Sequence, residues 1–130
     1  MSLDLTVGMT SEKSELVSEN NTAIKYGSGS IAVYATPAMV GLMEGACVDA
    51  IDHLLPEGSS TVGISIDIRH SAATPVGMKV RALAELVEIA GKRLVFRIEA
   101  FDEKEKIGEG IHQRYIIDVA KFLQKCNAKR

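Results

Sequence analysis

The chain has 130 residues, enough for one domain with its own hydrophobic core, and its 46% hydrophobic and 25% charged residues are typical of a globular protein. Its formal net charge of −2, with no cluster of Lys and Arg among aromatic residues, argues against nucleic-acid binding. No apolar run approaches the ~20 residues that span a bilayer, two cysteines are too few for a disulfide framework, and the N-terminus lacks a secretory pattern. We therefore expect a single domain over residues 1–130, in the cytoplasm and without a membrane partner.

The segment before residue 36 carries few strong patterns. Residues 3–7 and 13–17 have the composition of short strands, and Tyr26-Gly27-Ser28-Gly29-Ser30 interrupts the chain with small residues. We interpret this interruption as a plain connector or as a mobile segment at the mouth of the structure that follows.

Residues 36–55 are predicted to form the central helix. Apolar side chains recur at steps of three and four, as on one face of an α-helix: Met39, Leu42, Met43, Ala46, Cys47, Ala50 and Leu54. Thr36 suits the N-cap, Pro37 suits the first helical position, and Pro56-Glu57-Gly58 marks the end. Because its first half is apolar on nearly every side, the rest of the protein should enclose this helix.

Glu44 is the only charged residue between Thr36 and Val48. A carboxylate on an enclosed helix needs hydrogen bonds or a cation, or must hold its proton, because desolvation disfavours the charged form. Glu44 is therefore a candidate acid, base or nucleophile. The alternative is that Glu44 lies at the edge of the apolar stripe and reaches water.

After the helix the apolar period changes from 3.6 to 2, which predicts four antiparallel strands joined by short turns. The first covers residues 61–69, with one apolar face made by Val62, Ile64, Ile66 and Ile68. The second covers residues 77–89 and the third follows it, with inward faces Met78, Val80, Ala82, Ala84 and Leu86, and Leu94, Phe96, Ile98 and Ala100. The fourth covers residues 107–118 and has Ile111, Tyr115 and Ile117 on one side and Gly108, Gly110, His112 and Arg114 on the other. Residues 119–130 are expected to form a short helix or a frayed tail.

One long helix with four long strands predicts an α+β fold in which the helix lies across one face of a curved antiparallel sheet. This order of elements is that of the hotdog fold, a sheet wrapped around one central helix. Since such a sheet has exposed edges and an incompletely covered surface, we expect a homodimer or a dimer of dimers.

Three segments carry a family resemblance: residues 35–48, with Gly41-Leu42-Met43-Glu44-Gly45-Ala46-Cys47-Val48, residues 68–77, with His70-Ser71-Ala72-Ala73-Thr74-Pro75, and residues 107–114, with Gly108-Glu109-Gly110-Ile111-His112-Gln113-Arg114. They resemble the fluoroacetyl-CoA thioesterase-like family of the hotdog superfamily. The resemblance implies hydrolysis of an acyl-CoA thioester by a catalytic set of Thr36, Glu44 and His70. It also implies that Gly63 borders the site and that Arg114 approaches the acyl end of the substrate. In the fluoroacetyl-specific member a phenylalanine-bearing lid precedes the helix, whereas the matching region here holds Ser30. The resemblance therefore implies thioester hydrolysis without implying fluoroacetyl selectivity.

Thioester hydrolysis needs an attacking group and a site for the oxyanion. Glu44 could attack the carbonyl carbon and form a mixed anhydride, or it could draw a proton from an attacking water. Backbone N–H groups of residues 40–43, in the first turns of the helix, are the candidate oxyanion hole, where Gly41 and Leu42 would contact the substrate. His70, where a strand ends, could transfer a proton or orient the thioester.

Thr36 poses a geometric difficulty. Eight residues of helix separate it from Glu44, which is about 12 Å along a straight axis, too far for both to contact one small carbonyl. Either the helix begins nearer Gly41 and the chain doubles back, or Thr36 completes the site of a neighbouring subunit. A third interpretation is that Thr36 serves only as an N-cap.

Two other functions stay open, because the fold alone does not separate them from a thioesterase. A hotdog hydratase or dehydratase would use an Asp/His pair on an enoyl-CoA, which the Thr/Glu/His set disfavours. A non-catalytic protein would only bind CoA thioesters or another small ligand. His70, His112 and Cys47 have no metal-ligand spacing, and we expect no cofactor, since CoA is part of the substrate.

Overall fold

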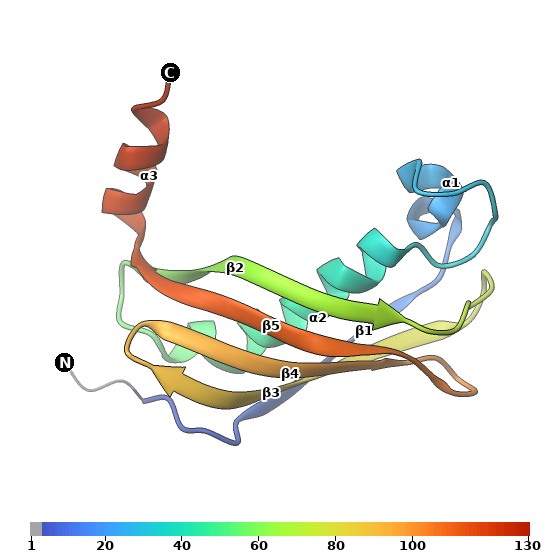
Figure 1. Cartoon of the computed structure of the whole chain (residues 1–130), viewed down its shortest axis with the longest axis horizontal. Coiled ribbons are helices and arrows are strands. Elements are labelled where there is room, and N and C mark those ends of the chain that lie inside the picture. The colour runs from blue at the N-terminus through green and yellow to red at the C-terminus, as the bar shows by residue number, and fades with distance from the viewer. Residues whose placement is uncertain (1–3) are drawn as a thin grey trace.

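Within the described residues, 4–130, five strands and one long helix form most of the structure, a computed structural model (Figure 1). In chain order the elements are β1 (Thr10–Leu16), η1 (Glu19–Asn21), α1 (Ala23–Tyr26), α2 (Thr36–Ile51), η2 (Asp52–Leu54), β2 (Ser59–His70), β3 (Lys79–Ala90), β4 (Arg93–Phe101), β5 (Lys106–Asp118) and α3 (Val119–Asn127). The strands form one antiparallel sheet in the order β1-β3-β4-β5-β2. The predicted α+β class, a curved antiparallel sheet with one long helix, is confirmed.

The core lies between α2 and the inner face of the sheet, and the helix crosses behind β2 and β5 in the view of Figure 1. Four fully buried side chains of α2 belong to the predicted stripe: Met39, Met43, Ala46 and Cys47. Ile51, which was not predicted, is fully buried as well, whereas the predicted Leu54 is only partly buried. The buried side chains of α2 meet the inner faces of β3 and β4, where Val80, Ala82, Leu86, Leu94, Phe96, Ile98 and Ala100 are all fully buried, as their alternation predicted. Each large side chain among them contributes about 1.5–3 kcal/mol through burial.

Helix α2 begins one residue earlier than its sequence signals indicated. Ala35 is the N-cap and makes no side-chain capping bond, so Thr36 occupies the first helical position and Pro37 the second. The predicted N-cap role of Thr36 is therefore wrong, and its hydroxyl is free for another partner. From Thr36 the helix runs without interruption to Ile51 and continues as the 3₁₀ turn η2 to Leu54.

A β-bulge in strand β2 changes which side chains face the helix. The register against β5 shifts between Gly63 and Ser65, so Ile64 is the extra residue. Before the bulge Gly63 lies opposite Arg114, and after it Ile66 lies opposite His112. Because directly opposed residues point to the same face, Thr61 and Gly63 precede the bulge on the inner face and Ile66 and Ile68 follow it there.

The predicted apolar face of this strand is consequently wrong for its first half. Val62 pairs with Tyr115 on the outer face, and Ile64 is 51% exposed. A strict period of two cannot pass through a bulge, since the inserted residue moves every earlier side chain to the opposite face. The bulge thereby directs Thr61 and Gly63 toward α2.

The inner face of β5 is unusually polar. His112 and Arg114 are 1% and 7% exposed, whereas the apolar Ile111 and Tyr115 on the outer face are each 42% exposed. Burying an imidazole and a guanidinium is costly unless both are hydrogen-bonded. Their partners are described with the site below.

The segments outside the sheet depart most from the sequence predictions. Leu3 lies outside the described residues and residues 4–7 form no strand, while the strand predicted at residues 13–17 is β1, which begins at Thr10. The short helices η1 and α1 were not predicted, and Gly27 ends α1 in the left-handed conformation at φ 70°. Residues 119–127 form the expected terminal helix, α3.

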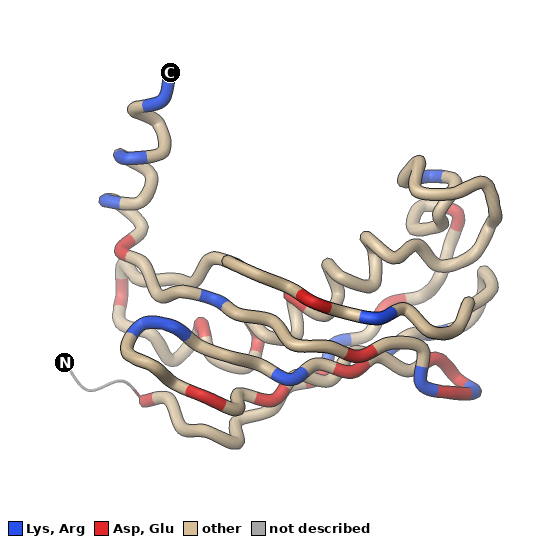
Figure 2. Tube along the Cα trace, viewed as in Figure 1, with Lys and Arg blue, Asp and Glu red and all other residues tan. Residues whose placement is uncertain are grey.

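Charge is distributed without a large field of one sign. Along the sheet Lys and Arg alternate with Asp and Glu, and α3 alone shows several basic residues in succession (Figure 2). No helix within residues 4–130 is long and apolar enough to cross a membrane.

Candidate active site

Thr36 and His70 form a hydrogen-bonded pair where α2 begins and β2 ends. The Thr36 Oγ1 and His70 Nδ1 atoms are 2.7 Å apart. The His70 Nε2 atom is buried and has no hydrogen-bond partner among the described residues. The pair borders a cleft of about 280 Å³ that is lined further by Ala23, Ser28, Val33, Tyr34, Ser71, Ala72 and Ala73. A hydroxyl beside an imidazole can exchange a proton with it, so the pair can move a proton at the edge of this cleft.

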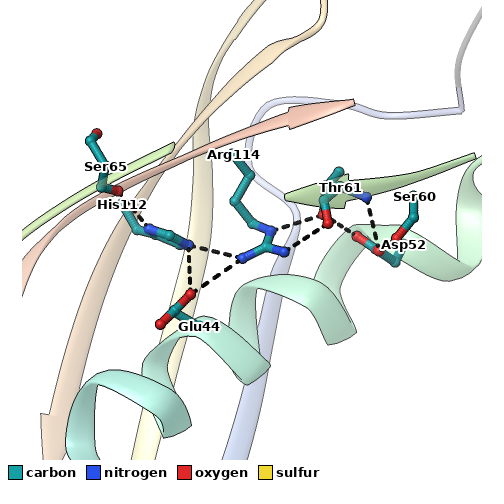
Figure 3. Close-up of polar contacts among 7 residues, drawn as sticks. All are labelled: Glu44, Asp52, Ser60, Thr61, Ser65, His112 and Arg114. Carbon is teal, nitrogen blue, oxygen red and sulfur yellow. Dashed lines mark hydrogen bonds and ion pairs between the residues drawn. The ribbon is translucent and has the colours of Figure 1, made fainter. Parts of the chain in front are cut away.

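Glu44 lies in a second cluster, with Arg114 and His112 of β5 (Figure 3). Its Oε2 atom is 3.7 Å from Arg114 Nη1 and 4.0 Å from His112 Nε2. The Glu44 side chain is 41% exposed, whereas its two partners are almost completely buried. The carboxylate is therefore held on one side by a buried cation and reaches the surface on the other, as both a nucleophile and a base require.

The backbone of Gly63 packs closely against this carboxylate. A Cβ atom at position 63 would lie 3.3 Å from Glu44 Oε2 and 3.1 Å from the His112 ring. Any side chain here would crowd both groups, so glycine lets strand β2 pass this close to them. The sequence prediction that placed Gly63, Glu44 and Arg114 near one another agrees with this geometry, although their roles stay predictions.

The two clusters are separated along α2. The helix is continuous from Thr36, so the alternative in which it begins nearer Gly41 is wrong. The separation of about 12 Å between the Thr36 and Glu44 positions then holds. The structure brings Thr36 to His70 and Glu44 to Arg114, and it does not bring the predicted catalytic set together within one subunit.

The early start of α2 also affects the predicted oxyanion hole. Only the first four N–H groups of a helix lack an intrahelical acceptor, and the Met39 N–H already donates to the Ala35 carbonyl. The N–H groups of residues 40–43 lie deeper in the helix, so they are not free for an oxyanion. Gly41 is nevertheless exposed with open space at its Cα, and Leu42 is buried beneath it.

His112 is the site residue that the sequence analysis missed. The sequence places it on one face of the fourth strand and shows no metal-ligand spacing for it, and no role was predicted, yet it is buried at the centre of the Glu44 cluster. The available signal was the alternation of Gly110, His112 and Arg114 in β5. Small and polar residues on the inner face of a central strand indicate a site, because an ordinary core would place apolar side chains there.

Cys47 is excluded as the attacking group. Its thiol is fully buried on α2, and burial raises its pKa to about 12. The thiolate needed for attack is scarcely formed at neutral pH. Within residues 4–130 no three His, Cys, Asp or Glu side chains are grouped as metal ligands.

Stability should depend on pH through His70 and His112. Burial lowers the pKa of both imidazoles below the usual 6.5, and the nearby Arg114 cation lowers that of His112 further. As the pH falls below about 6.5, the unfolded chain binds protons that the folded protein resists, so the free energy of unfolding should decrease. Urea unfolding between about pH 5 and pH 8 measures this dependence. His112→Gln removes one of the two groups and should flatten it, and an unchanged slope would contradict the assignment.

A single helix enclosed by a curled antiparallel sheet, with a Thr–His pair at its start and an Arg-paired carboxylate at its middle, defines a hotdog-fold protein of the thioesterase class. Comparisons with known proteins agree. The chain is 44% identical over 97 residues to the fluoroacetyl-CoA thioesterase of Streptantibioticus cattleyicolor, covering 75% of this chain and 70% of that protein. A family model described as fluoroacetyl-CoA-specific thioesterase matches residues 17–120. The chain belongs to this family.

Solved structures support the same assignment. A structure of the fluoroacetyl-CoA thioesterase FlK superposes with a TM-score of 0.91 at 36% identity, covering 97% of this chain and 98% of that chain. A hypothetical protein of Thermus thermophilus, a thioesterase superfamily member, superposes with a TM-score of 0.88 at 30% identity over 95% of this chain and 91% of that one. These likenesses confirm the predicted hotdog fold.

Proposed function

We propose that this chain is an acyl-CoA thioesterase that hydrolyses a short or compact acyl-CoA to the free acid and CoA. The observation that carries the proposal is the Glu44 carboxylate, which lies beside the buried Arg114 cation and is itself 41% exposed. Water supplies the hydroxyl group of the acid and the proton of the CoA thiol, so the reaction needs no cofactor. Cys47 and Cys126 are free thiols, which suits the cytoplasmic location expected from the sequence.

Glu44 acts in this proposal as the base that activates water or as the nucleophile that forms a mixed anhydride. In either route the thioester carbon is attacked, its oxygen becomes an oxyanion, and the C–S bond then breaks as the CoA thiolate leaves and takes up a proton. In the nucleophile route water then hydrolyses the mixed anhydride, which releases the acid and regenerates Glu44. Arg114 supplies positive charge near the acyl end, where negative charge develops. His70, neutral because burial lowers its pKa, accepts or donates a proton through its pair with Thr36.

The proposal includes a homodimer in which Thr36 and His70 of one subunit complete the site around Glu44 of the other. Strand β2 pairs with β5 alone, so its second edge is open to another strand. Its outer face and that of β5 expose Ile64, Ile111 and Tyr115 by 42–51%. An apolar patch beside an unpaired edge is what an interface between two copies would bury. A dimer of dimers would need a second contact surface, because the dimer already uses this edge.

A compact acyl group is supported by the size of the cleft beside Thr36 and His70. Its volume of about 280 Å³ lies below the range of about 300–1,000 Å³ that holds drug-sized ligands. The relative named above acts on fluoroacetyl-CoA. Here the predicted lid position holds the exposed Ser30, which cannot close over a small acyl group as an aromatic ring could, so fluoroacetyl selectivity is not part of the proposal.

The test is release of free CoA thiol from acetyl-, propionyl-, branched, aromatic and fluoroacetyl-CoA. Turnover of at least one compact thioester well above the rate without enzyme is the expected result. Loss of enoyl absorbance from an enoyl-CoA without thiol release would instead identify a hydratase. Thermal stabilisation by CoA with no turnover of any thioester would identify a binding protein.

A further inference from the structure

The Arg114 guanidinium is held at all three of its nitrogen atoms (Figure 3). Its Nε donates to Thr61 Oγ1 at 2.8 Å, and its Nη2 donates to the Thr61 carbonyl oxygen at 2.9 Å. Its Nη1 lies 3.1 Å from His112 Nε2 and 3.7 Å from Glu44 Oε2. Two of these contacts come from one residue, Thr61, whose position fixes the plane of the guanidinium.

The direction of each hydrogen bond follows from the chemistry of the groups. A guanidinium only donates, so Thr61 Oγ1 must accept from Arg114 and its own hydrogen must point elsewhere. That hydrogen has an acceptor in Asp52 Oδ1 at 2.7 Å. The Asp52 carboxylate therefore fixes the hydroxyl rotor of Thr61 with its lone pair toward Arg114.

The same reasoning fixes the state of His112. Because Arg114 Nη1 donates, His112 Nε2 must be the unprotonated acceptor. The proton of the neutral ring is then on Nδ1, which donates to the Ser65 carbonyl at 2.7 Å. The guanidinium is consequently clamped between a neutral imidazole and the Thr61–Asp52 pair, and Glu44 is the anion that it faces.

The negative charge of Asp52 does not stabilise the C-terminal end of α2. Asp52 is the C-cap of α2, where a negative charge meets the negative end of the helix dipole. The Asp52 carboxylate accepts three hydrogen bonds from β2 there. The donors are the Ser60 hydroxyl at 2.9 Å, the Thr61 N–H at 3.3 Å and the Thr61 hydroxyl. Its contacts thus tie the end of α2 to the residue that orients Arg114.

We propose that Asp52 is a positioning residue that acts through Thr61 to fix the Arg114 guanidinium beside Glu44. Asp52 forms no hydrogen bond or ion pair with the Glu44 carboxylate or with Arg114, so its influence passes through Thr61, by way of the hydroxyl and the main-chain N–H of that residue. The kinetic part of this inference rests on the proposed thioesterase function, whereas the structural part does not.

Thr61→Val and Asp52→Ala remove the link at its two ends. Valine keeps the shape of threonine and the main-chain carbonyl but has no hydroxyl, so Arg114 Nε loses its acceptor. We expect kcat for the best acyl-CoA to fall about tenfold in each variant, because small misplacement of a catalytic group is costly. Thr61→Ser, which keeps the hydroxyl, should retain kcat within about twofold of the wild type. Asp49→Ala, on the exposed face of the same helix, is the matched control for Asp52→Ala.

A double-mutant cycle separates positioning from general damage to the fold. If Asp52 acts mainly by orienting the Thr61 hydroxyl, adding Asp52→Ala to Thr61→Val should lower kcat by much less than the roughly tenfold that Asp52→Ala costs alone. Additive losses in kcat, or loss of thermal stability in either variant with kcat unchanged, would overturn the inference.

A second measurement does not depend on activity. The Arg114 Nε–H signal in ¹⁵N NMR, assigned by its absence in Arg114→Lys, should exchange slowly with water in the wild type and in Thr61→Ser, and quickly in Thr61→Val and Asp52→Ala. Equal exchange in all four proteins would overturn the clamp even if thioesters are hydrolysed. The expected exchange pattern in a protein that cleaves no thioester would instead keep the clamp and reject the proposed function.

Discussion

Glu44→Gln is expected to lower kcat for every hydrolysed acyl-CoA at least about a hundredfold, the usual scale for loss of a base or nucleophile. Glutamine has nearly the same shape as glutamate but can neither attack the thioester carbon nor accept a proton from water. Folding should be intact, because the carboxylate is 41% exposed and Arg114 keeps its bonds to Thr61 and His112. Because Glu44 is partly exposed and Arg114 is buried, loss of this pair should cost more than the ~1 kcal/mol of a surface pair and less than the ~3–5 kcal/mol of a fully buried one. Thiol release and thermal unfolding, measured side by side, check both statements.

Asp49→Asn is the control for this substitution. It makes the same acid-to-amide change on the same helix, where Asp49 and its partner Lys13 are both about half exposed. Its activity should equal that of the wild type. A Glu44→Gln protein with wild-type kcat would remove Glu44 from the chemistry and leave the binding function as the better explanation of the fold.

The parts of the structure that local patterns determine could be predicted. The helix at residues 36–55 and the inner faces of β3 and β4 follow from apolar spacing alone. An element that packs against one layer needs apolar side chains at a regular spacing along its sequence. The turns at Gly91 and at Asp102 follow from residues that favour turns, and both hairpins form where expected.

The parts that depend on contacts between distant segments could not be predicted. The bulge at Ile64 satisfies the pairing of β2 with β5, and no local signal in residues 61–69 distinguishes Ile64 from the apolar residues around it. The hydroxyl of Thr36 looked like a helix cap because its partner, His70, is 34 residues away. Local reasoning assigns a polar side chain to the nearest backbone group, so it misses partners that the fold supplies.

The candidate site contains residues that a local pattern reveals and residues that only contacts between distant segments reveal. Glu44 was identified because a lone charge on an apolar helix is visible in the sequence, whereas its partner His112 lies on another element 68 residues later. Asp52 and Thr61 were missed because each has an ordinary explanation, as a polar residue near a helix end and as a strand residue. Only the contacts to Arg114 reveal a different role.

Mixing two inactive variants should restore activity if the site is shared between subunits. Thr36→Ala removes the hydroxyl that pairs with His70, so it should lower kcat strongly, and Glu44→Gln removes the carboxylate. In a mixed dimer one site carries both substitutions, but the other combines the intact Thr36 of one chain with the intact Glu44 of its partner. Random mixing of the two chains makes half of the dimers mixed, so about a quarter of the wild-type activity should return.

The matched control mixes Thr36→Ala with a chain that carries both substitutions, which cannot form an intact site in any pairing and should recover nothing. Differently tagged chains, purified together by both tags, prove that mixed dimers were assayed. If such dimers are as inactive as their parents, Thr36 and Glu44 do not act in one shared site. Recovery near a quarter would explain why the uninterrupted helix α2 holds two essential residues about 12 Å apart: each end would serve a different active site of the dimer.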